Sequence, residues 1–142
     1  MYKDILLAVD VQDPEDQMKA VGTAAEYAKA FGSTLHVISV VPDYGLAIVG
    51  SYFPPDHEEK TLAMAKENLQ AFCDKHLPEG IEVQHIVGHG RIYQEVLRYA
   101  EEVGADLIVM ASHKPGLEDY LVGPNAERVM RHASCSVLVV RP

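Results

Sequence analysis

The residues with the clearest chemical potential lie in a turn between an apolar run and a helix. Residues 106–110, DLIVM, have the length and composition of a buried strand, and residues 111–116, ASHKPG, cannot continue it. Residues 123–126, GPNA, then open a helical segment that extends to Ala133. Free N–H groups at a helix start and the positive end of the helix dipole both favour a bound anion. The spacing therefore predicts an anion site over the end of this strand.

Asp10 is the most informative acidic residue in the chain. It directly follows residues 5–9, ILLAV, a run typical of a strand that is buried on both faces. A carboxylate in such a place is costly unless it has a partner. We therefore interpret Asp10 as a hydrogen-bonding group for a ribose hydroxyl or for a metal–phosphate unit. The alternative is that Asp10 caps the turn before Pro14.

No arrangement of a nucleophile with a general base stands out. Ser112 and His113 are neighbours, and adjacent side chains in an extended segment point apart. The sequence contains no G-x-S-x-G, G-x-x-x-x-G-K-[ST] or H-E-x-x-H motif, and residues 88–90, GHG, lack the third glycine of a dinucleotide fingerprint. His85 and His89 could hold a metal, but two imidazoles alone make an incomplete site. We expect them to be ordinary loop and edge residues.

The elements that must position these residues are strands and helices, which alternate along the chain. Continuous apolar runs predict buried strands, and apolar residues at helical spacing predict helices that start near Asp13-Pro14 and Asp56 and end at Gly32 and Gly104. The strands are expected at residues 5–9, 35–41, 81–87, 106–110 and 136–140, and the helices at residues 13–31, 56–76, 92–103 and 123–133.

This alternation predicts one α/β domain, residues 1–142, with an open five-stranded parallel sheet and helices on both faces. Residues 81–87 alternate apolar with polar side chains, which indicates an edge strand or a strand with one wetter face. Ligands bind such sheets at the carboxyl ends of the strands. The loops after Val9, Val87 and Met110 are therefore the candidate walls of a site.

Composition and charge narrow the classes of function. A net charge of −9 with scattered basic residues argues against a nucleic-acid surface. Cys73 and Cys135 lack C-x-x-C spacing and are interpreted as small apolar side chains in a reducing compartment. No leader peptide or membrane-spanning run is evident, so a cytoplasmic protein without membrane or nucleic-acid partners is expected. Residues 42–55, rich in proline, glycine and aromatic side chains, are predicted to form a mobile loop.

At four places the chain resembles the universal stress proteins of the UspA superfamily. Residues 3–10, KDILLAVD, are similar to the family's first strand, and residues 35–37 are similar to its second. Val87-Gly88 followed by Ile92 resembles the loop before a long helix. Residues 107–142 resemble the C-terminal signature most specifically, in the form of the F-like branch. The resemblance implies a Rossmann-like sheet of the adenine nucleotide alpha hydrolase type, with strand order 3-2-1-4-5.

The resemblance also implies a role for each matching position. Asp10 would face a ribose, the Val37 backbone would bond the edge of adenine, and Gly88 would let the sugar approach. The segments 110–114 and 123–125 would surround a triphosphate. The full set of expected cofactor-binding residues is Ala8, Asp10, Val37, Gly88, Met110, Ala111, Ser112, His113, Lys114, Gly123, Pro124 and Asn125.

The chain departs from the signature of nucleotide-binding members, which is G-x-x-G, nine residues, and then G followed by Ser or Thr. Ala111 replaces the first glycine, and the second has no clean counterpart. Pro124 takes the hydroxyl position, which removes one N–H donor together with the hydroxyl. Lys114 offers a charge and Asn125 an amide in compensation.

The resemblance implies a stress-response protein that binds ATP, alone or with Mg²⁺, and that hydrolyses it weakly at most. It also implies a homodimer through the strand 136–140, which could pair further into a tetramer. A monomer would expose this apolar edge, although the strand could instead be covered within one subunit. One alternative function is an interaction module of the same fold with a degenerate site. Another is a small enzyme or flavin carrier, which is disfavoured because no nucleophile, metal set or aromatic flavin sandwich is found.

Overall fold

Five parallel strands form a single sheet in the computed structural model, which describes residues 1–42, 57–112 and 124–142. The predicted 42–55 loop and the site candidates His113, Lys114 and Gly123 lie almost entirely outside the described residues. The strands are β1 (Asp4–Ala8), β2 (Thr34–Pro42), β3 (Glu82–Gly90), β4 (Leu107–Ala111) and β5 (Ser136–Val140). Their order is β3-β2-β1-β4-β5, as predicted, and the alternating strand β3 lies at an edge.

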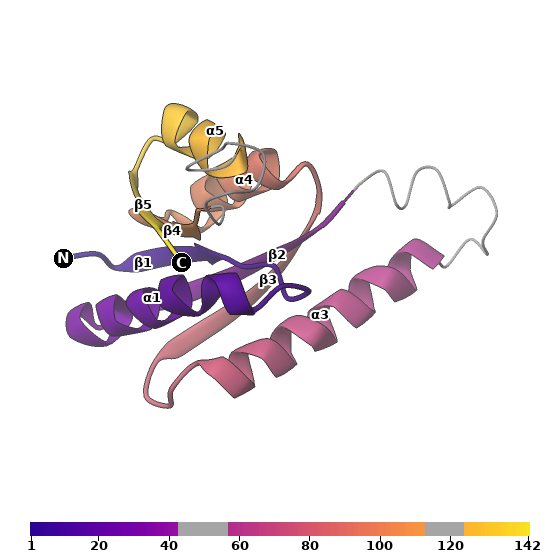
Figure 1. The fold of residues 1–142 in the computed structure, drawn as a ribbon, viewed down its shortest axis with the longest axis horizontal. Helices are drawn as coiled ribbons and strands as arrows, with labels where there is room; N and C mark the ends of the chain where they lie inside the picture. Colours follow the sequence, from indigo (N-terminus) through magenta and orange to yellow (C-terminus); the bar gives the residue numbers. More distant parts are fainter. Residues whose placement is uncertain (43–56, 113–123) are drawn as a thin grey trace.

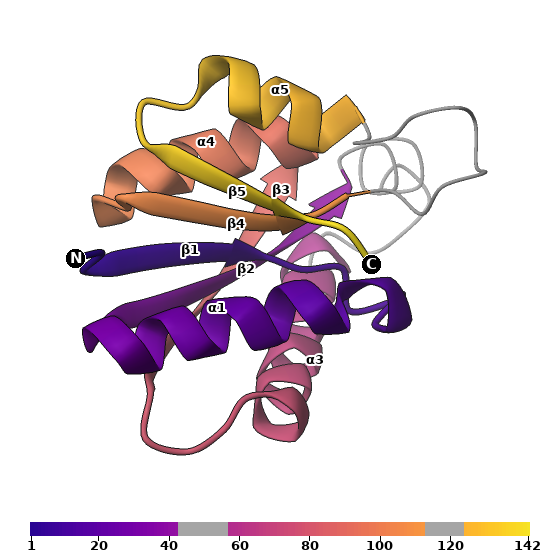
Figure 2. The ribbon, with the colours of Figure 1, turned by 60° about the vertical axis from the view of Figure 1, so that its left-hand side comes forward.

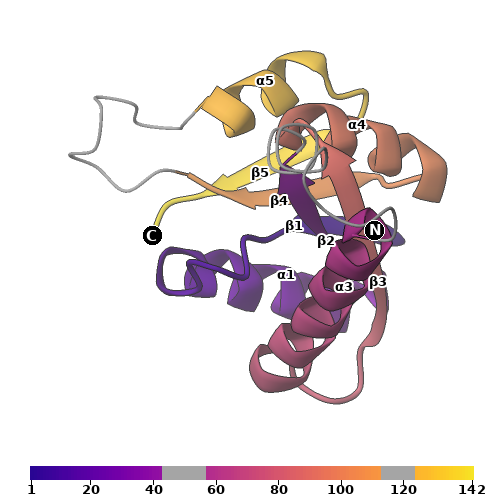
Figure 3. The same ribbon diagram turned by 90° about the vertical axis from the view of Figure 1, so that its right-hand side faces the viewer.

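Within the described ranges, four α-helices cover the two faces of the sheet (Figures 1 and 2). Helices α1 (Met18–Phe31) and α3 (His57–His76) lie on one face, and α4 (Ile92–Val103) and α5 (Pro124–His132) lie on the other (Figure 3). Gly32 and Gly104 end α1 and α4 in the left-handed conformation, with φ of 64° and 67°. Glycine adopts this conformation without the steric cost of a Cβ atom, which explains both predicted helix ends.

The first helix starts later than the sequence predicts. A short 3-10 turn, η1 (Glu15–Gln17), precedes α1, and neither the Pro14 nor the Gln17 cap position has a side-chain capping hydrogen bond. The predicted start near Asp13-Pro14 is therefore too early for α1, which begins at Met18. The nearby polar contacts are made by Gln17, whose side chain turns back toward the loop after β1.

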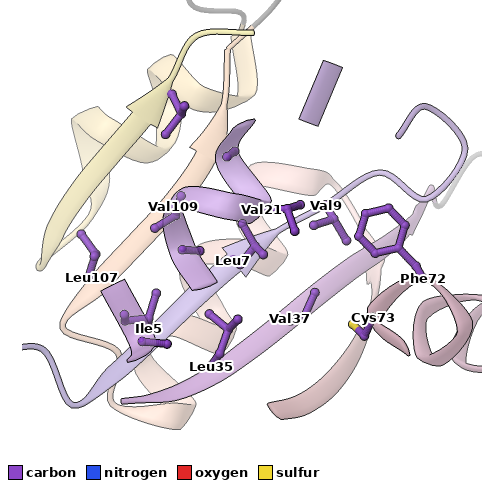
Figure 4. Packing of buried hydrophobic residues seen from close by; sticks show 14 of the residues in the cluster. Ile5, Leu7, Val9, Val21, Leu35, Val37, Phe72, Cys73, Leu107 and Val109 are labelled. Carbon is purple, nitrogen blue, oxygen red and sulfur yellow. The ribbon is translucent and has the colours of Figure 1, made fainter. Parts of the chain in front are cut away.

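Two apolar cores hold the layers together. The core between the sheet and helices α1 and α3 contains Leu7, Leu35, Val109 and Phe72 (Figure 4). The core under α4 and α5 contains Leu6 and Ile108 among others. Strand β1 is buried on both faces because its side chains alternate between these cores, which is why its sequence shows a continuous apolar run. None of the helices in the described residues combines the length and apolar character needed to cross a membrane.

Candidate functional site

A cleft of about 580 Å³ opens at the carboxyl ends of the central strands. Its walls come from the loop after β1, the last residues of β2 and β4, the starts of α4 and α5, and the amino-terminal half of α3. Strands β1 and β4 are neighbours, and the helices that follow them lie on opposite faces of the sheet. Such a divergence leaves a crevice where open α/β sheets bind ligands.

Gln17 holds the loop that forms one wall of the cleft. Its side chain is buried, and its Oε1 accepts a hydrogen bond from the Asp10 N–H at 2.6 Å. Its Nε2 donates to the carbonyl oxygens of Asp10 and Asp13, each at 2.7 Å. One side-chain amide therefore forms hydrogen bonds with three backbone groups of this loop, where neither a strand nor a helix supplies regular backbone partners. The sequence interpretation missed this residue.

Asp10 lies in this loop, but not in the buried setting that the sequence suggested. The residue is exposed, and its Oδ1 accepts a hydrogen bond from the Gln12 N–H at 2.9 Å. This contact is an Asx turn, so the capping alternative is confirmed as a description of the local structure. Asp10 also lines the cleft, so its carboxylate can contact a ligand there.

Val37 is buried inside the sheet. It lies between its partners Leu7 in β1 and His85 in β3, and its exposed fraction is 0%. Strands flank it on both sides and it is absent from the cleft lining, so its expected contact with adenine stays a prediction without support from this geometry. The cleft is lined instead by residues 38–41 of the same strand.

Val40 has the backbone geometry that was expected of Val37. Ile38 accepts a hydrogen bond from the Val9 N–H, so the peptide groups of Ile38 face β1. Peptide groups two residues apart on a strand face the same side. The N–H and C=O of Val40 therefore also face the β1 side, but β1 has ended at Ala8. Among the described residues, none meets these two groups there, and Val40 lines the cleft.

Gly88 makes room for a protein side chain. A Cβ atom at this position would lie 3.1 Å from the Cβ atom of Glu95 and 3.3 Å from its Oε1. Gly88 is also absent from the cleft lining, and the expectation that a ligand approaches it stays a prediction. The glycine is explained by tertiary packing of α4 against β3.

Glu95 is a nearly enclosed carboxylate that the sequence interpretation also missed. Its side chain is 12% exposed, and it accepts hydrogen bonds from the His89 N–H at 3.0 Å and from Arg98 at 2.9 and 3.0 Å. The Arg98 hydrogen bond, aided by that of His89, holds the pKa of Glu95 below its ordinary value against the opposing effect of burial. The Glu95 carboxylate therefore links the end of β3, at His89, to α4.

The other residues expected to bind the nucleotide are only partly brought together. Ala8, Met110, Ala111, Ser112 and Asn125 all line the cleft. Pro124 is the exposed first residue of α5 and does not belong to the lining.

Ser112 is the most unusual of these residues. It is 5% exposed, and its Oγ has no hydrogen-bond partner among the residues that the structure describes. A buried hydroxyl without a partner typically costs about 1–3 kcal/mol.

Metal and thiol chemistry find little support in the described part of the chain. Within residues 1–42, 57–112 and 124–142, no group of three or more histidine, cysteine or acidic side chains is arranged to hold a metal ion. His89 instead lies 3.4 Å from a carboxylate oxygen of Glu58. Both cysteines are free, and burial raises the pKa of Cys73 to about 11, with a contribution from Asp74. Burial likewise raises the pKa of Cys135, with a contribution from Asp106. Raised thiol pKa values disfavour the reactive thiolate.

Three acidic residues give the cleft its charge. The lining includes Asp10, Asp13 and Asp16, and it includes no lysine or arginine from the described ranges. The backbone N–H groups at the start of α5 supply the opposing positive potential, near Asn125. The cleft therefore combines an acidic wall, an apolar interior and one helix N-terminus.

Comparisons with known proteins agree with this architecture. Residues 1–141 match a protein family described as the universal stress protein family. Universal stress protein G of Escherichia coli O157:H7 is 36% identical over 145 residues, which covers 99% of this chain and 100% of that protein. The solved structure of hypothetical protein MJ0577 has a TM-score of 0.75 at 26% identity and covers 100% of this chain and 97% of that one.

A further solved structure shows the same fold with a ligand. The universal stress protein from Archaeoglobus fulgidus in complex with dAMP has a TM-score of 0.61 at 21% identity. The alignment covers 99% of this chain and 98% of that chain. At this level of identity, the similarity shows the fold alone.

Proposed function

The chain belongs to the universal stress protein family, and we propose that it binds an adenine nucleotide in the cleft at the carboxyl ends of β1, β2 and β4. It would act as a cytoplasmic stress-response protein, formed by a single domain over residues 1–142. Nucleotide binding would be the function, and ATP would be hydrolysed slowly at most, because no arrangement of a nucleophile with a general base stands out in the sequence. The narrower assignment to the F-like branch stays a prediction from residues 107–142.

The open backbone edge at Val40 carries this proposal. Adenine presents an acceptor at N1 beside the donor amino group at N6. The Val40 N–H and C=O present the complementary donor and acceptor, beyond the point where β1 ends. Met64 and Ile92 line the same cleft and are partly exposed, so they offer apolar surface for the faces of the base.

The sugar and phosphate would extend across the strand ends. Asp10 keeps one carboxylate oxygen outside its Asx turn and would accept a hydrogen bond from a ribose hydroxyl. Ser112 and the start of α5 at Asn125 would receive a phosphate. The complex of the Archaeoglobus fulgidus protein with dAMP supports a ligand of this class. ATP is one candidate, and a Mg²⁺ ion on its phosphates would lower the charge that it brings into the cleft.

Adenosine should bind at least about tenfold more tightly than inosine, because inosine reverses both groups that face Val40. Isothermal titration of the two nucleosides measures this ratio. The two ligands have the same sugar and almost the same size, so each controls for the other. Equal affinities would remove Val40 from the site. If neither the nucleosides nor AMP and ATP bind, the proposed function fails, and an interaction module of the same fold becomes the better description.

We also propose that the protein forms a homodimer through β5, with pairing into a tetramer as a further step. Among the described strands, β5 has β4 as its only neighbour. The Val140 carbonyl accepts a hydrogen bond from the Ser112 N–H, so Val140 faces β4. Alternation then turns the peptide groups of Val137 and Val139 outward, where they form an unpaired edge.

Replacing Val139 with proline should convert a dimer into a monomer while the fold is retained, because this change removes an outward N–H. Leu138→Pro is the matched control, since it removes an N–H that faces β4 and should destabilise the fold itself. Sedimentation equilibrium measures the mass, and circular dichroism follows the fold. A Val139→Pro variant that stays dimeric and folded would show that the subunits meet elsewhere.

A further inference from the structure

We propose that the groove between α4 and α5 binds a short acidic segment of a partner protein. An apolar side chain of that segment would enter a pocket in the carboxyl-terminal half of the groove. Its carboxylates would meet Arg91 and Arg128 near the starts of the two helices. Neither arginine lines the cleft at the strand ends, so this inference does not depend on nucleotide binding.

The groove lies above the middle of the sheet. Helices α4 and α5 pack side by side (Figures 1 and 2), and both start at the cleft, since Ile92 and Asn125 line it. Helix α4 packs on β1, β2 and β3, whereas α5 packs on β5. The groove between them therefore lies away from both edges of the sheet. A partner bound there would leave the outer edge of β5 open for the proposed dimer.

A pocket of about 370 Å³ occupies the carboxyl-terminal half of this groove. Its apolar lining is formed by Leu97, Ala100, Ala105, Ile108 and Ala133. The volume is within the range of ligand pockets, which is about 300–1,000 Å³. An apolar side chain that enters the pocket would lose contact with water, which favours binding in proportion to the area buried.

Arginine side chains mark the other end of the groove, near the helix starts. The Arg128 guanidinium lies over the Tyr93 ring, 4.9 Å from its centroid, and Gln94 donates a hydrogen bond to the Tyr93 hydroxyl at 3.2 Å. The Gln94 hydrogen bond is the largest cause of a lowered pKa of Tyr93. Arg91 and Arg128 lower this pKa further, which places both guanidinium groups near the phenol. Both arginines are exposed, and guanidinium groups pair well with carboxylates.

The basic end and the pocket form one continuous surface. Gln94 contacts Tyr93 and also lines the pocket. Arg128 and His132 are four residues apart on α5 and therefore share a face, and His132 lines the pocket. From Tyr93 to Glu101, another lining residue, α4 rises about 12 Å. About four extended residues of a partner would cover this distance.

The charges of the groove favour a short acidic peptide. Arg98 and Arg131 each pair with glutamates of their own helix, so we do not count them toward the basic end. Glu101 lines the pocket, at the end opposite to Arg91. Two arginines beside an apolar pocket suit a few carboxylates next to an apolar side chain. A nucleic acid requires an extended basic surface, and the whole chain has a net charge of −9.

The probe is a capped, fluorescently labelled peptide, LSEEESL, which places a leucine at each end and therefore assumes no binding direction. Fluorescence anisotropy at low salt measures its affinity. The control peptide LSQQQSL lacks the charges, and SSEEESS lacks the leucines. Each control should bind about tenfold more weakly than LSEEESL. Raising the salt concentration should weaken LSEEESL, because exposed charge pairs are screened.

Variants of the chain assign the binding to the groove. Arg91→Gln and Arg128→Gln should each weaken LSEEESL by about threefold, and the double variant by about tenfold. Lys75→Gln is the control, since it makes the same change of charge on an exposed residue of α3, on the other face of the sheet (Figure 3). Ala133→Leu should weaken LSEEESL by about tenfold and leave SSEEESS unchanged, because the larger side chain fills the pocket. Circular dichroism checks that each variant is folded.

Several outcomes would overturn the proposal. LSEEESL might bind no better than the two control peptides, or not at all up to about 1 mM. Arg128→Gln and Lys75→Gln might have equal effects. Tighter binding of a thymidine oligonucleotide of the same length, with the same dependence on Arg91 and Arg128, would assign the groove to nucleic acid. A changed mass of the double variant in sedimentation equilibrium would assign it to a contact between copies of this chain. Titration with adenosine tests the cleft separately, so either proposal can fail while the other stands.

Discussion

Replacing Gln17 with alanine is expected to lower the free energy of unfolding by about 2–4 kcal/mol. The change removes three hydrogen bonds of 2.6–2.7 Å and leaves the Asp10 N–H and the Asp13 carbonyl oxygen without this partner, whereas the Asp10 carbonyl oxygen keeps a hydrogen bond from the Asp13 N–H at 3.2 Å. The site is buried, so water replaces these contacts poorly. Urea denaturation followed by circular dichroism measures the loss.

Gln12→Ala is the matched control for this prediction. Gln12 is the same residue type in the same loop, but it is exposed, and its hydrogen bond to Asp10 comes from the backbone N–H. We expect a change within about 0.5 kcal/mol. Equal effects at the two positions would show that Gln17 does not organise the loop.

Gln17→Glu tests the role of the Nε2 donor alone, because it preserves the shape of the side chain. The new carboxyl can still accept from the Asp10 N–H, but in its ionised form it has no donor for the two carbonyl oxygens that Nε2 contacts. Repulsion from these oxygens and burial both favour the protonated form in the folded state. The destabilisation should therefore be greatest near neutral pH and should shrink as the pH falls.

The position of Gln17 in the sequence contains a signal that identifies it. Val21, Ala24 and Ala28 are buried on one face of α1, and Gln17 precedes them at the same helical spacing. A polar residue on such a face must find an internal partner. The apolar periodicity predicted the helix correctly, but only the exception to that periodicity points toward the loop and the cleft.

The fold was predictable because it depends on patterns that repeat along the chain. Continuous apolar runs gave four of the strands, the alternating run gave the edge strand β3, and Gly32 and Gly104 gave two helix ends. The candidate site was less predictable because it depends on where strands end relative to their neighbours. The sequence cannot show that β1 stops beside Ile38. For this reason the unpaired backbone N–H and C=O groups of β2 are those of Val40 and not those of Val37.

Gly88 illustrates the same limit in another way. The sequence suggested that this glycine admits a ligand, yet its missing Cβ leaves space for Glu95, seven residues further along the chain. A glycine indicates a close approach, but only the tertiary structure shows what approaches. Glu95, the residue that approaches Gly88, is therefore expected to contribute to the stability of the fold.

Replacing Glu95 with alanine is expected to destabilise the fold by about 2–3 kcal/mol. The carboxylate is enclosed, accepts the His89 N–H at 3.0 Å and pairs with Arg98 through two hydrogen bonds. The alanine variant leaves the His89 N–H without its acceptor and opens space beside Gly88. Thermal and urea unfolding measure the loss. Glu102→Ala is the control, because Glu102 also pairs with Arg98 but is 55% exposed, so its loss should cost less than about 1 kcal/mol.

The dependence of stability on pH tests whether the charge of Glu95 matters or only its shape. The Arg98 hydrogen bond is the largest cause of the depressed pKa of Glu95 in the folded state. A depressed pKa means that the charged carboxylate stabilises the fold above the unfolded-state pKa, and that this contribution is lost as the pH falls through the folded-state pKa. The native chain should therefore lose its stability advantage over Glu95→Gln as the pH falls below about 4.5. A difference between the two proteins that stays constant as the pH falls well below 4.5 would assign the effect to packing against Gly88 and not to the ion pair.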